Sequence, residues 1–214
     1  LLGAAIFTEL AEAGVRDYQI SLDGPQAIHD QTRVMANGKG TFERIWENLL
    51  AIKRTSFEAK ITLRLHFDAE TAFTMEPLLD ALRRDFLDDP RFVVFFKSIE
   101  RLGGPADEKI KILNEDEKQQ AVDHLRQQLF GEAAPPPAES EGYVCYASRP
   151  NSLLIRADGR IGKCTVALND DRNTIGRLRP DGTLELDQSR IRPWLRGLET
   201  MDPEILGCPL AGLP

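Results

Sequence analysis

The feature that most limits the folds open to this chain is an alternation of strand-like and helix-like segments over its first 130 residues. Residues 18–23 and 57–68 carry the alternating pattern of β-strands, and residues 91–96 form a short apolar run. Stretches with apolar residues at helical spacing precede, separate and follow these segments. Strands that alternate with helices of this length favour parallel βαβ units. The predicted fold class of residues 1–130 is therefore α/β.

The apolar run at residues 91–96 carries a further expectation. Its residues do not alternate between polar and apolar, as they would in a strand with one solvated face. We therefore predict that this strand is buried on both faces of the sheet.

The first strand-like segment delivers polar groups to one end of the sheet. Gln19, Ser21 and Asp23 alternate with apolar residues, so the three share one face of the strand. Gly24 and Pro25 then end it, because proline has no N–H for the ladder and glycine favours a turn. Ligands of α/β barrels bind where strands end at their carboxyl side. We therefore expect a ligand site at this rim.

Composition disfavours several classes of function. The chain has 214 residues, 42% of them apolar, and no long uncharged apolar run of the kind that spans a membrane. A formal net charge of −7 disfavours nucleic acid and anionic membrane surfaces as partners. Residues 1–7 lack the basic region of a signal peptide, which favours a cytoplasmic location. The first residue is not Met, and we expect the chain to be part of a longer protein.

The second part of the chain, from residue 131 onward, differs from the first in composition and in its predicted elements. Residues 131–142 contain three consecutive prolines and predict a linker between residues 1–130 and 143–214. Two β-hairpins around Asp-Gly turns, at 152–164 and 173–186, and a short helix with apolar residues from 191 to 198 are predicted beyond it. A unit of this size often needs a metal to stabilise it.

Three cysteines lie in this second part: Cys145, Cys164 and Cys208. An odd number at wide spacing does not indicate a secreted disulfide framework. Gly159 stands between the first two in the spacing C-x13-G-x4-C, and the hairpin turn at Gly159 would bring the two cysteines together. They are then either ligands of one metal centre or small buried apolar residues.

Two motifs carry a resemblance to a known family. QISLDGPQAIHDQTR, residues 19–33, resembles the fourth-strand segment of radical S-adenosylmethionine (SAM) enzymes, in the branch with a C-terminal SPASM domain. The C-x13-G-x4-C spacing resembles the opening of the SPASM cysteine pattern. The resemblance implies the C-terminal half of a six-stranded partial (β/α) barrel at 1–130, followed by an incomplete, SPASM-like β-hairpin domain at 143–214. It also implies SAM and [4Fe–4S] clusters as cofactors.

The resemblance assigns roles to individual residues. Ser21 matches the strand residue that meets the SAM ribose, and Arg33 matches an arginine that helps to hold SAM, while Gln19 and Asp23 share the rim. The alternatives are a Ser21 hydroxyl bonded to a neighbouring strand and an Arg33 salt bridge with a residue such as Asp30.

Two residues of the second strand, Arg64 and His66, are expected to line a substrate cavity. The histidine is there either a proton-transfer group or a hydrogen-bonded wall residue.

The metal centre departs from the family pattern. Cys145 and Cys164 are the implied cluster ligands, and Cys208 lies where the next cysteine group begins. Ala211 and Ile205 stand where a C-x2-C partner of Cys208 would be needed, so no four-cysteine site is complete within the chain.

The implied function is a peptide or protein maturase, an oxidoreductase that uses a 5′-deoxyadenosyl radical to modify a side chain. A flavodoxin or ferredoxin would donate electrons. Thr165 follows Cys164 where sulfatase-maturing members have an aspartate, which disfavours formylglycine formation. The chain lacks the C-x3-C-x2-C motif of the SAM-cleaving cluster, so we expect this polypeptide alone to be inactive.

Two further functions remain open from the residues. The chain is alternatively a stand-alone metal-binding or peptide-binding module built on a partial α/β sheet. A structural zinc unit on Cys145, Cys164 and Cys208 is the other alternative.

Overall fold

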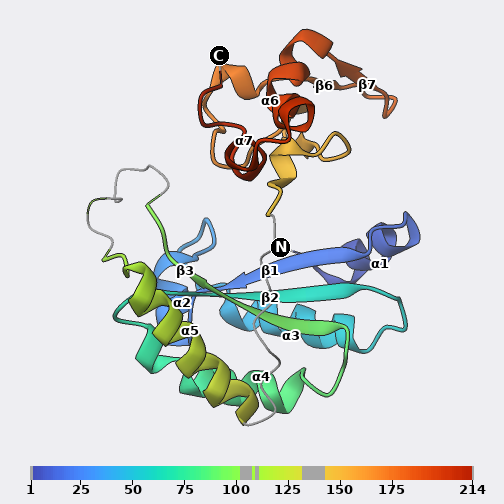
Figure 1. The fold of residues 1–214 in the computed structure, drawn as a ribbon. Helices are drawn as coiled ribbons and strands as arrows, with labels where there is room; N and C mark the ends of the chain where they lie inside the picture. The colour runs from blue at the N-terminus through green and yellow to red at the C-terminus, as the bar shows by residue number, and fades with distance from the viewer. Residues whose placement is uncertain (1, 102–107, 109–110, 132–142, 214) are drawn as a thin grey trace. The chain divides into compact units, whose positions relative to one another are not determined.

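A computed structural model describes residues 2–101, 108, 111–131 and 143–213 (Figure 1). The chain divides into two compact units, Leu1–Pro136 and Pro137–Pro214. Of the predicted linker at 131–142, residues 132–142 lie outside the described residues. The protein is a mixed α/β chain with a parallel three-stranded sheet in the first unit and a separate antiparallel sheet in the second.

The first unit follows the predicted alternation of helices and strands. Its parallel sheet has the order β1-β2-β3. The short helix α2, directly after the predicted rim, was not predicted. The elements are α1 (Ala4–Glu12), β1 (Asp17–Leu22), α2 (Gln26–Thr32), α3 (Phe42–Lys53), β2 (Lys60–Phe67), α4 (Glu76–Asp85), β3 (Phe92–Ser98) and α5 (Glu115–Phe130).

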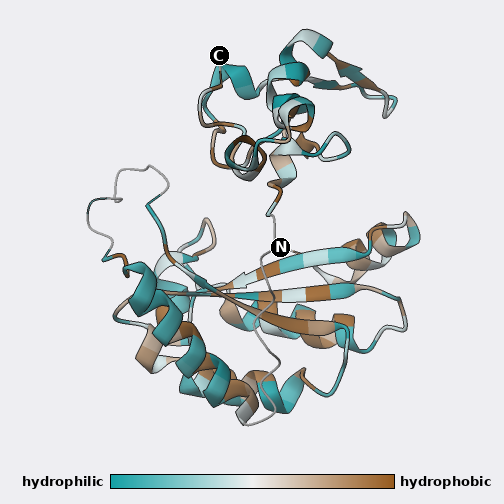
Figure 2. Cartoon of the chain, viewed as in Figure 1, coloured by the Kyte–Doolittle hydropathy of each residue, from teal (hydrophilic) through white to brown (hydrophobic). Residues whose placement is uncertain are grey.

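One face of this sheet carries the core of the unit. Leu22, Leu63 and Leu65 are fully buried, and α3, α4 and α5 all lie on the same side of the sheet (Figure 1). Hydrophobic and polar residues alternate along β1 and β2 (Figure 2). The alternation follows from the pleat, which points successive side chains to opposite faces. The polar residues of both strands therefore share the face away from these helices.

The prediction that the third strand is buried on both faces was wrong. Phe95, in the middle of β3, is 50% exposed, and Val93 is only half-buried. Both lie on the same face of the sheet as Ser21 and Arg64, because Ser21 pairs in register with Arg64 and Arg64 with Phe95. In the described part of the chain, the core cluster packs only against the opposite face. We call the face with Ser21, Arg64 and Phe95 the open face.

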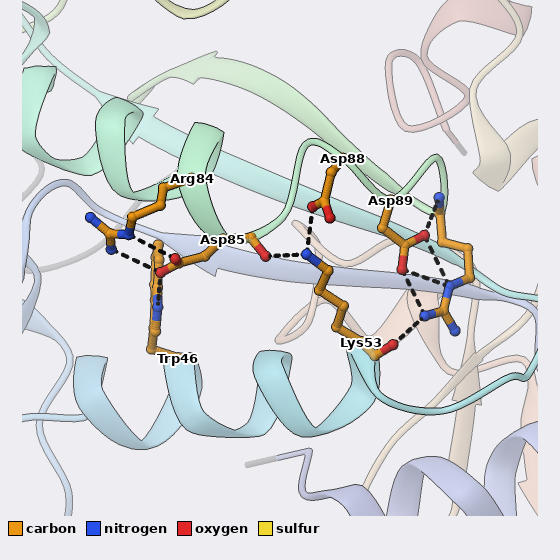
Figure 3. A network of polar contacts seen from close by, with 7 residues as sticks. Trp46, Lys53, Arg84, Asp85, Asp88 and Asp89 are labelled. Carbon is orange, nitrogen blue, oxygen red and sulfur yellow. Dashed lines mark hydrogen bonds and ion pairs between the residues drawn. The ribbon is translucent and has the colours of Figure 1, made fainter.

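A polar network fixes the other end of the sheet, where β3 begins. Lys53, at the end of α3, donates to the backbone oxygen of Asp85 (2.7 Å) and pairs with Asp88 (Figure 3). Arg91 pairs with Asp89 and donates to the backbone oxygen of Lys53 (2.7 Å). The network joins the end of α3 to the segment between α4 and β3. It therefore stabilises the end of the sheet that lies opposite the predicted rim.

The N-terminus of α3 is capped by a residue from outside the helix. Thr41 precedes the first turn of α3, but its side chain makes no capping hydrogen bond. Oδ1 of Asp30 instead accepts from the backbone N–H groups of Thr41 (2.8 Å) and Phe42 (2.9 Å). A Cβ at Gly40 would overlap this carboxylate, so the close approach requires glycine. A residue of the α2 helix therefore caps α3 across the intervening loop.

The second unit contains both predicted hairpins, and they join into one antiparallel sheet of order β4-β5-β6-β7. Gly159 and Gly182 have positive φ values of 80° and 84° in the two turns. Ile161, Ile175 and Trp194 form the centre of its core. The elements are β4 (Leu154–Ile155), β5 (Arg160–Gly162), β6 (Gly176–Leu178), β7 (Leu184–Leu186), α6 (Gln188–Thr200) and α7 (Pro203–Gly207).

No helix among the described residues combines the length and the apolar character that crossing a membrane requires.

Candidate functional site

The centre of the predicted rim is the carboxylate of Asp23, directly after β1. Its Oδ2 accepts from Nε of Arg33 (2.6 Å), and its Oδ1 contacts Nδ1 of His66 (2.7 Å). Burial opposes ionisation of Asp23, but the hydrogen bonds from His66 and Arg33 outweigh it and hold the pKa of this carboxyl well below its usual range. Arg33 thus forms an ion pair, with Asp23 rather than Asp30 as its partner.

The buried side chain of His29 fixes the backbone next to this ion pair. His29 accepts a hydrogen bond at Nδ1 from the backbone N–H of Asp23 (3.1 Å), so its proton is on Nε2, which contacts Oγ1 of Thr41 (3.0 Å). Thr41 in turn donates to the backbone oxygen of Arg33 (2.7 Å). Burial lowers the pKa of His29, which favours the neutral ring that this chain of bonds requires. His29 therefore positions both Asp23 and Arg33.

His29 is not among the residues to which the sequence assigned a role. It lies within α2, and its side chain is fully buried. Its partners are six and twelve residues away along the chain, in no regular period. No local pattern therefore marks it, and only the tertiary structure reveals its function as a support.

A first cavity, of about 290 Å³, lies along the edge of β1. We call it the edge cavity. Gln19, Ser21 and Arg33, three of the four predicted cofactor-binding residues, line it together. Its remaining lining is largely apolar and comes from Leu2, Ile20, Ile45, Asn48, Leu49 and Ile52.

A second cavity, of about 240 Å³, lies at the carboxyl ends of the three strands. We call it the rim cavity. Asp23 lines this cavity rather than the edge cavity, and Arg33 lines both. Arg64 and His66, predicted to line a substrate cavity, are on its wall. Lys97, Ser98, Ile99 and Glu100, from the end of β3 and beyond, complete it.

Cys164, in the second unit, is buried and held by one side chain that sequence reasoning missed. Oδ1 of Asn173 accepts from the backbone N–H groups of Lys163 (2.8 Å) and Cys164 (2.9 Å). Its Nδ2 donates to the backbone oxygens of Cys164 (2.7 Å) and Ala167 (2.9 Å). Asn173 is itself fully buried, so these four bonds fix the backbone on both sides of Cys164.

The segments that carry the three cysteines adjoin one another. The N–H of Cys145 donates to the backbone oxygen of Leu206 (2.9 Å), two residues before Cys208. The hydroxyl of Tyr146 accepts from the N–H of Thr165 (2.9 Å), next to Cys164. Yet nowhere in the described residues do three or more His, Cys, Asp or Glu side chains gather as a metal site, and the three cysteines form no disulfide.

The residues of the chain suit SAM, one of the two implied cofactors, better than they suit the other, a [4Fe–4S] cluster. The edge cavity offers a hydroxyl, an amide and a guanidinium beside apolar walls, which suits part of SAM, although its volume is at the small end for ligand sites. A [4Fe–4S] cluster whose four irons are all held by protein needs four thiolates, and the chain has three cysteines that do not gather as a metal site in the described residues. The cysteines therefore do not fit a complete cluster within this chain.

Comparison of the sequence with protein-family models and with curated proteins gives no match to either.

Proposed function

We propose that this chain is the C-terminal part of a radical SAM/SPASM maturase that modifies a side chain of a peptide or protein. The observation that carries the proposal is that Gln19, Ser21 and Arg33 line one cavity. The resemblance assigned Ser21 and Arg33 to SAM, and they lie twelve positions apart in the sequence. A shared cavity is the arrangement that a common ligand requires.

The side chains are available for such a ligand. Within the described residues, the Ser21 hydroxyl has no hydrogen-bond partner, whereas the alternative reading would pair it with the neighbouring strand. Arg33 uses Nε for Asp23, which leaves its two Nη groups for a carboxylate. Ser21 would meet the ribose, and Arg33 would hold the methionine carboxylate. When bound, SAM supplies the 5′-deoxyadenosyl radical that takes a hydrogen atom from the substrate.

The architecture supports the same proposal. Three parallel strands with their core on one face are what half of a six-stranded partial (β/α) barrel would present, with the open face toward the lumen. The hairpins and adjoining cysteine segments of the second unit agree with a SPASM-like domain. The three cysteines alone do not supply the four thiolates of a fully protein-ligated cluster.

Calorimetric titration of SAM into the chain tests the cofactor site. We expect weak binding that falls at least fivefold in Ser21→Ala and in Arg33→Gln, each of which removes one polar contact. Arg44→Gln is the matched control, because Arg44 is exposed on α3 and does not line the cavity. Equal losses in all three variants, or no binding at all, would contradict the proposal.

A second experiment separates the enzyme from a zinc module. Anaerobic reconstitution with iron and sulfide, followed by a reductant and SAM, should yield no 5′-deoxyadenosine from these 214 residues, because the C-x3-C-x2-C motif is absent. Detection of that product would refute this expectation. Tight zinc binding without iron uptake would instead favour a structural zinc unit. A C-x3-C-x2-C motif upstream in the parent gene would support the maturase.

A further inference from the structure

Among the described residues, the central cation of the open face, Arg64, forms neither an ion pair nor a hydrogen bond at Nε. Arg64 lies in the middle strand, and its Nε is buried without a hydrogen bond. Across the described residues it also takes part in no ion pair. An unsatisfied buried donor on a charged group destabilises the folded protein. Because Arg64 lines the rim cavity, an anion bound there would pair with its guanidinium group.

The other charges of the rim cavity cancel. Asp23 pairs with Arg33, and Glu100 pairs with Lys97. The hydrogen bond from Lys97 lowers the pKa of Glu100, so this pair stays ionised at neutral pH. Counted over Asp23, Arg33, Lys97, Glu100 and Arg64, the cavity carries one unit of positive charge, on Arg64. A singly charged anion balances it, and a phosphate dianion does not.

A second polar group of the cavity is oriented for a ligand. The Asp23 carboxylate only accepts hydrogen bonds, so Nδ1 of a neutral His66 carries the proton and Nε2 is left as an acceptor. His66 lies two residues beyond Arg64 on the same face of β2, about 6.6 Å along the strand. The side chain of Arg64 is long enough to span that distance. Arg64 and His66 thus present a cation next to an acceptor.

We propose that the rim cavity binds a small carboxylic acid that carries a hydroxyl next to the carboxylate. The carboxylate pairs with Arg64, and the hydroxyl donates to Nε2 of His66. This site does not rest on the proposed SAM site, which uses Ser21 in the edge cavity. Arg33 lines both cavities, so it is left out of the test.

Glycolate is the probe, and nitrogen-15 NMR of the arginine Nε and histidine ring signals is the readout. We expect saturable binding in the millimolar range, with shifts at Arg64 and His66. Acetate, which lacks the hydroxyl, should bind several-fold more weakly, and methyl glycolate, which lacks the charge, should not bind. Inorganic phosphate should bind no more tightly than glycolate.

Two variants assign the contacts. Arg64→Met should weaken glycolate binding at least tenfold, whereas Arg44→Met, on the exposed face of α3, should not. Arg64→Met should still fold, since it removes a buried donor that has no partner. His66→Asn keeps a donor near the position of Nδ1 but has no Nε2. It should abolish the preference for glycolate over acetate.

Several results would overturn this proposal. These are unchanged glycolate affinity in Arg64→Met, tighter binding of phosphate than of glycolate, and a preference for glycolate that survives in His66→Asn. Loss of SAM binding in Ser21→Ala with intact glycolate binding would leave the rim site standing. The proposed SAM site and the proposed rim site can therefore be refuted independently of each other.

Discussion

Replacing Asp23 by Asn changes the centre of the rim by one atom and removes its charge. The two shortest hydrogen bonds that the carboxylate accepts come from Arg33 (2.6 Å) and His66 (2.7 Å), and its side chain is only 18% exposed. A charge-assisted hydrogen bond contributes about 1.5–3 kcal/mol and a neutral one about 0.5–1.5 kcal/mol. Each bond therefore loses about 1 kcal/mol, and Asp23→Asn should destabilise the first unit by about 2 kcal/mol at neutral pH.

The pH dependence of this loss has a definite sign. The pKa of Asp23 is depressed in the folded protein, so its stabilisation is present above the ordinary carboxyl pKa of about 3.9 and is lost as the pH falls toward the folded value. The stability difference between the wild type and Asp23→Asn should be full at pH 7 and should shrink below about pH 4. Amide hydrogen exchange in residues 17–22 and 60–67 confines the measurement to the first unit.

The same variant should change the tautomer of His66. An Asn side chain that accepts from Arg33 through its oxygen turns its NH₂ toward His66, so Nδ1 must accept and the proton moves to Nε2. Nitrogen-15 shifts of the ring report this change directly. A stability difference that persists undiminished at pH 3, or a ring that keeps its Nδ1 proton in Asp23→Asn, would refute the assignment of Asp23 as the partner of His66.

Three further substitutions test the supports of the two units. Gly40→Ala should cost about 2 kcal/mol in urea unfolding, because the new methyl group displaces the cap at Asp30. In an Asp30→Ala background the same change should cost far less, and additive costs would contradict the clash. Asn173→Ala should cost about 3 kcal/mol and make the Cys164 thiol react faster with a disulfide reagent; unchanged reactivity would show that the four bonds do not protect it. Lys163→Met should destabilise the β4–β5 hairpin by about 2 kcal/mol, since the buried amine donates to two backbone oxygens, and unaltered amide exchange there would argue against it.

Local patterns were sufficient for most of the secondary structure, α2 excepted, because their causes are local. The alternation in β1 and β2 and the spacing of the helices fix which side chains face the core, whatever the rest of the chain does. The Asp-Gly turns place both hairpins because glycine adopts a positive φ at no cost. The same logic failed for β3, where composition alone does not show whether anything covers the second face.

The contacts at the rim could not be predicted from local sequence patterns. Its polar side chains could be predicted from the alternation in β1, together with Arg64 and His66 on the second strand. The sequence did not indicate that Asp23 binds both Arg33 and His66, or that His29 holds the backbone beneath it. These contacts join residues that are up to 43 positions apart. They depend on how the strands pair, which no local pattern contains.

The sequence by itself thus determined the alternating elements, the parallel character of the first unit, the hairpins of the second and the identity of the rim residues, all of which follow from short-range periodicity and turn chemistry. Only the tertiary structure decided that one cavity gathers Gln19 and Ser21 while another gathers His66 and Arg64, and that Asn173 fixes Cys164. Strand register brings side chains from distant segments together, and it is set by the packing of the whole unit.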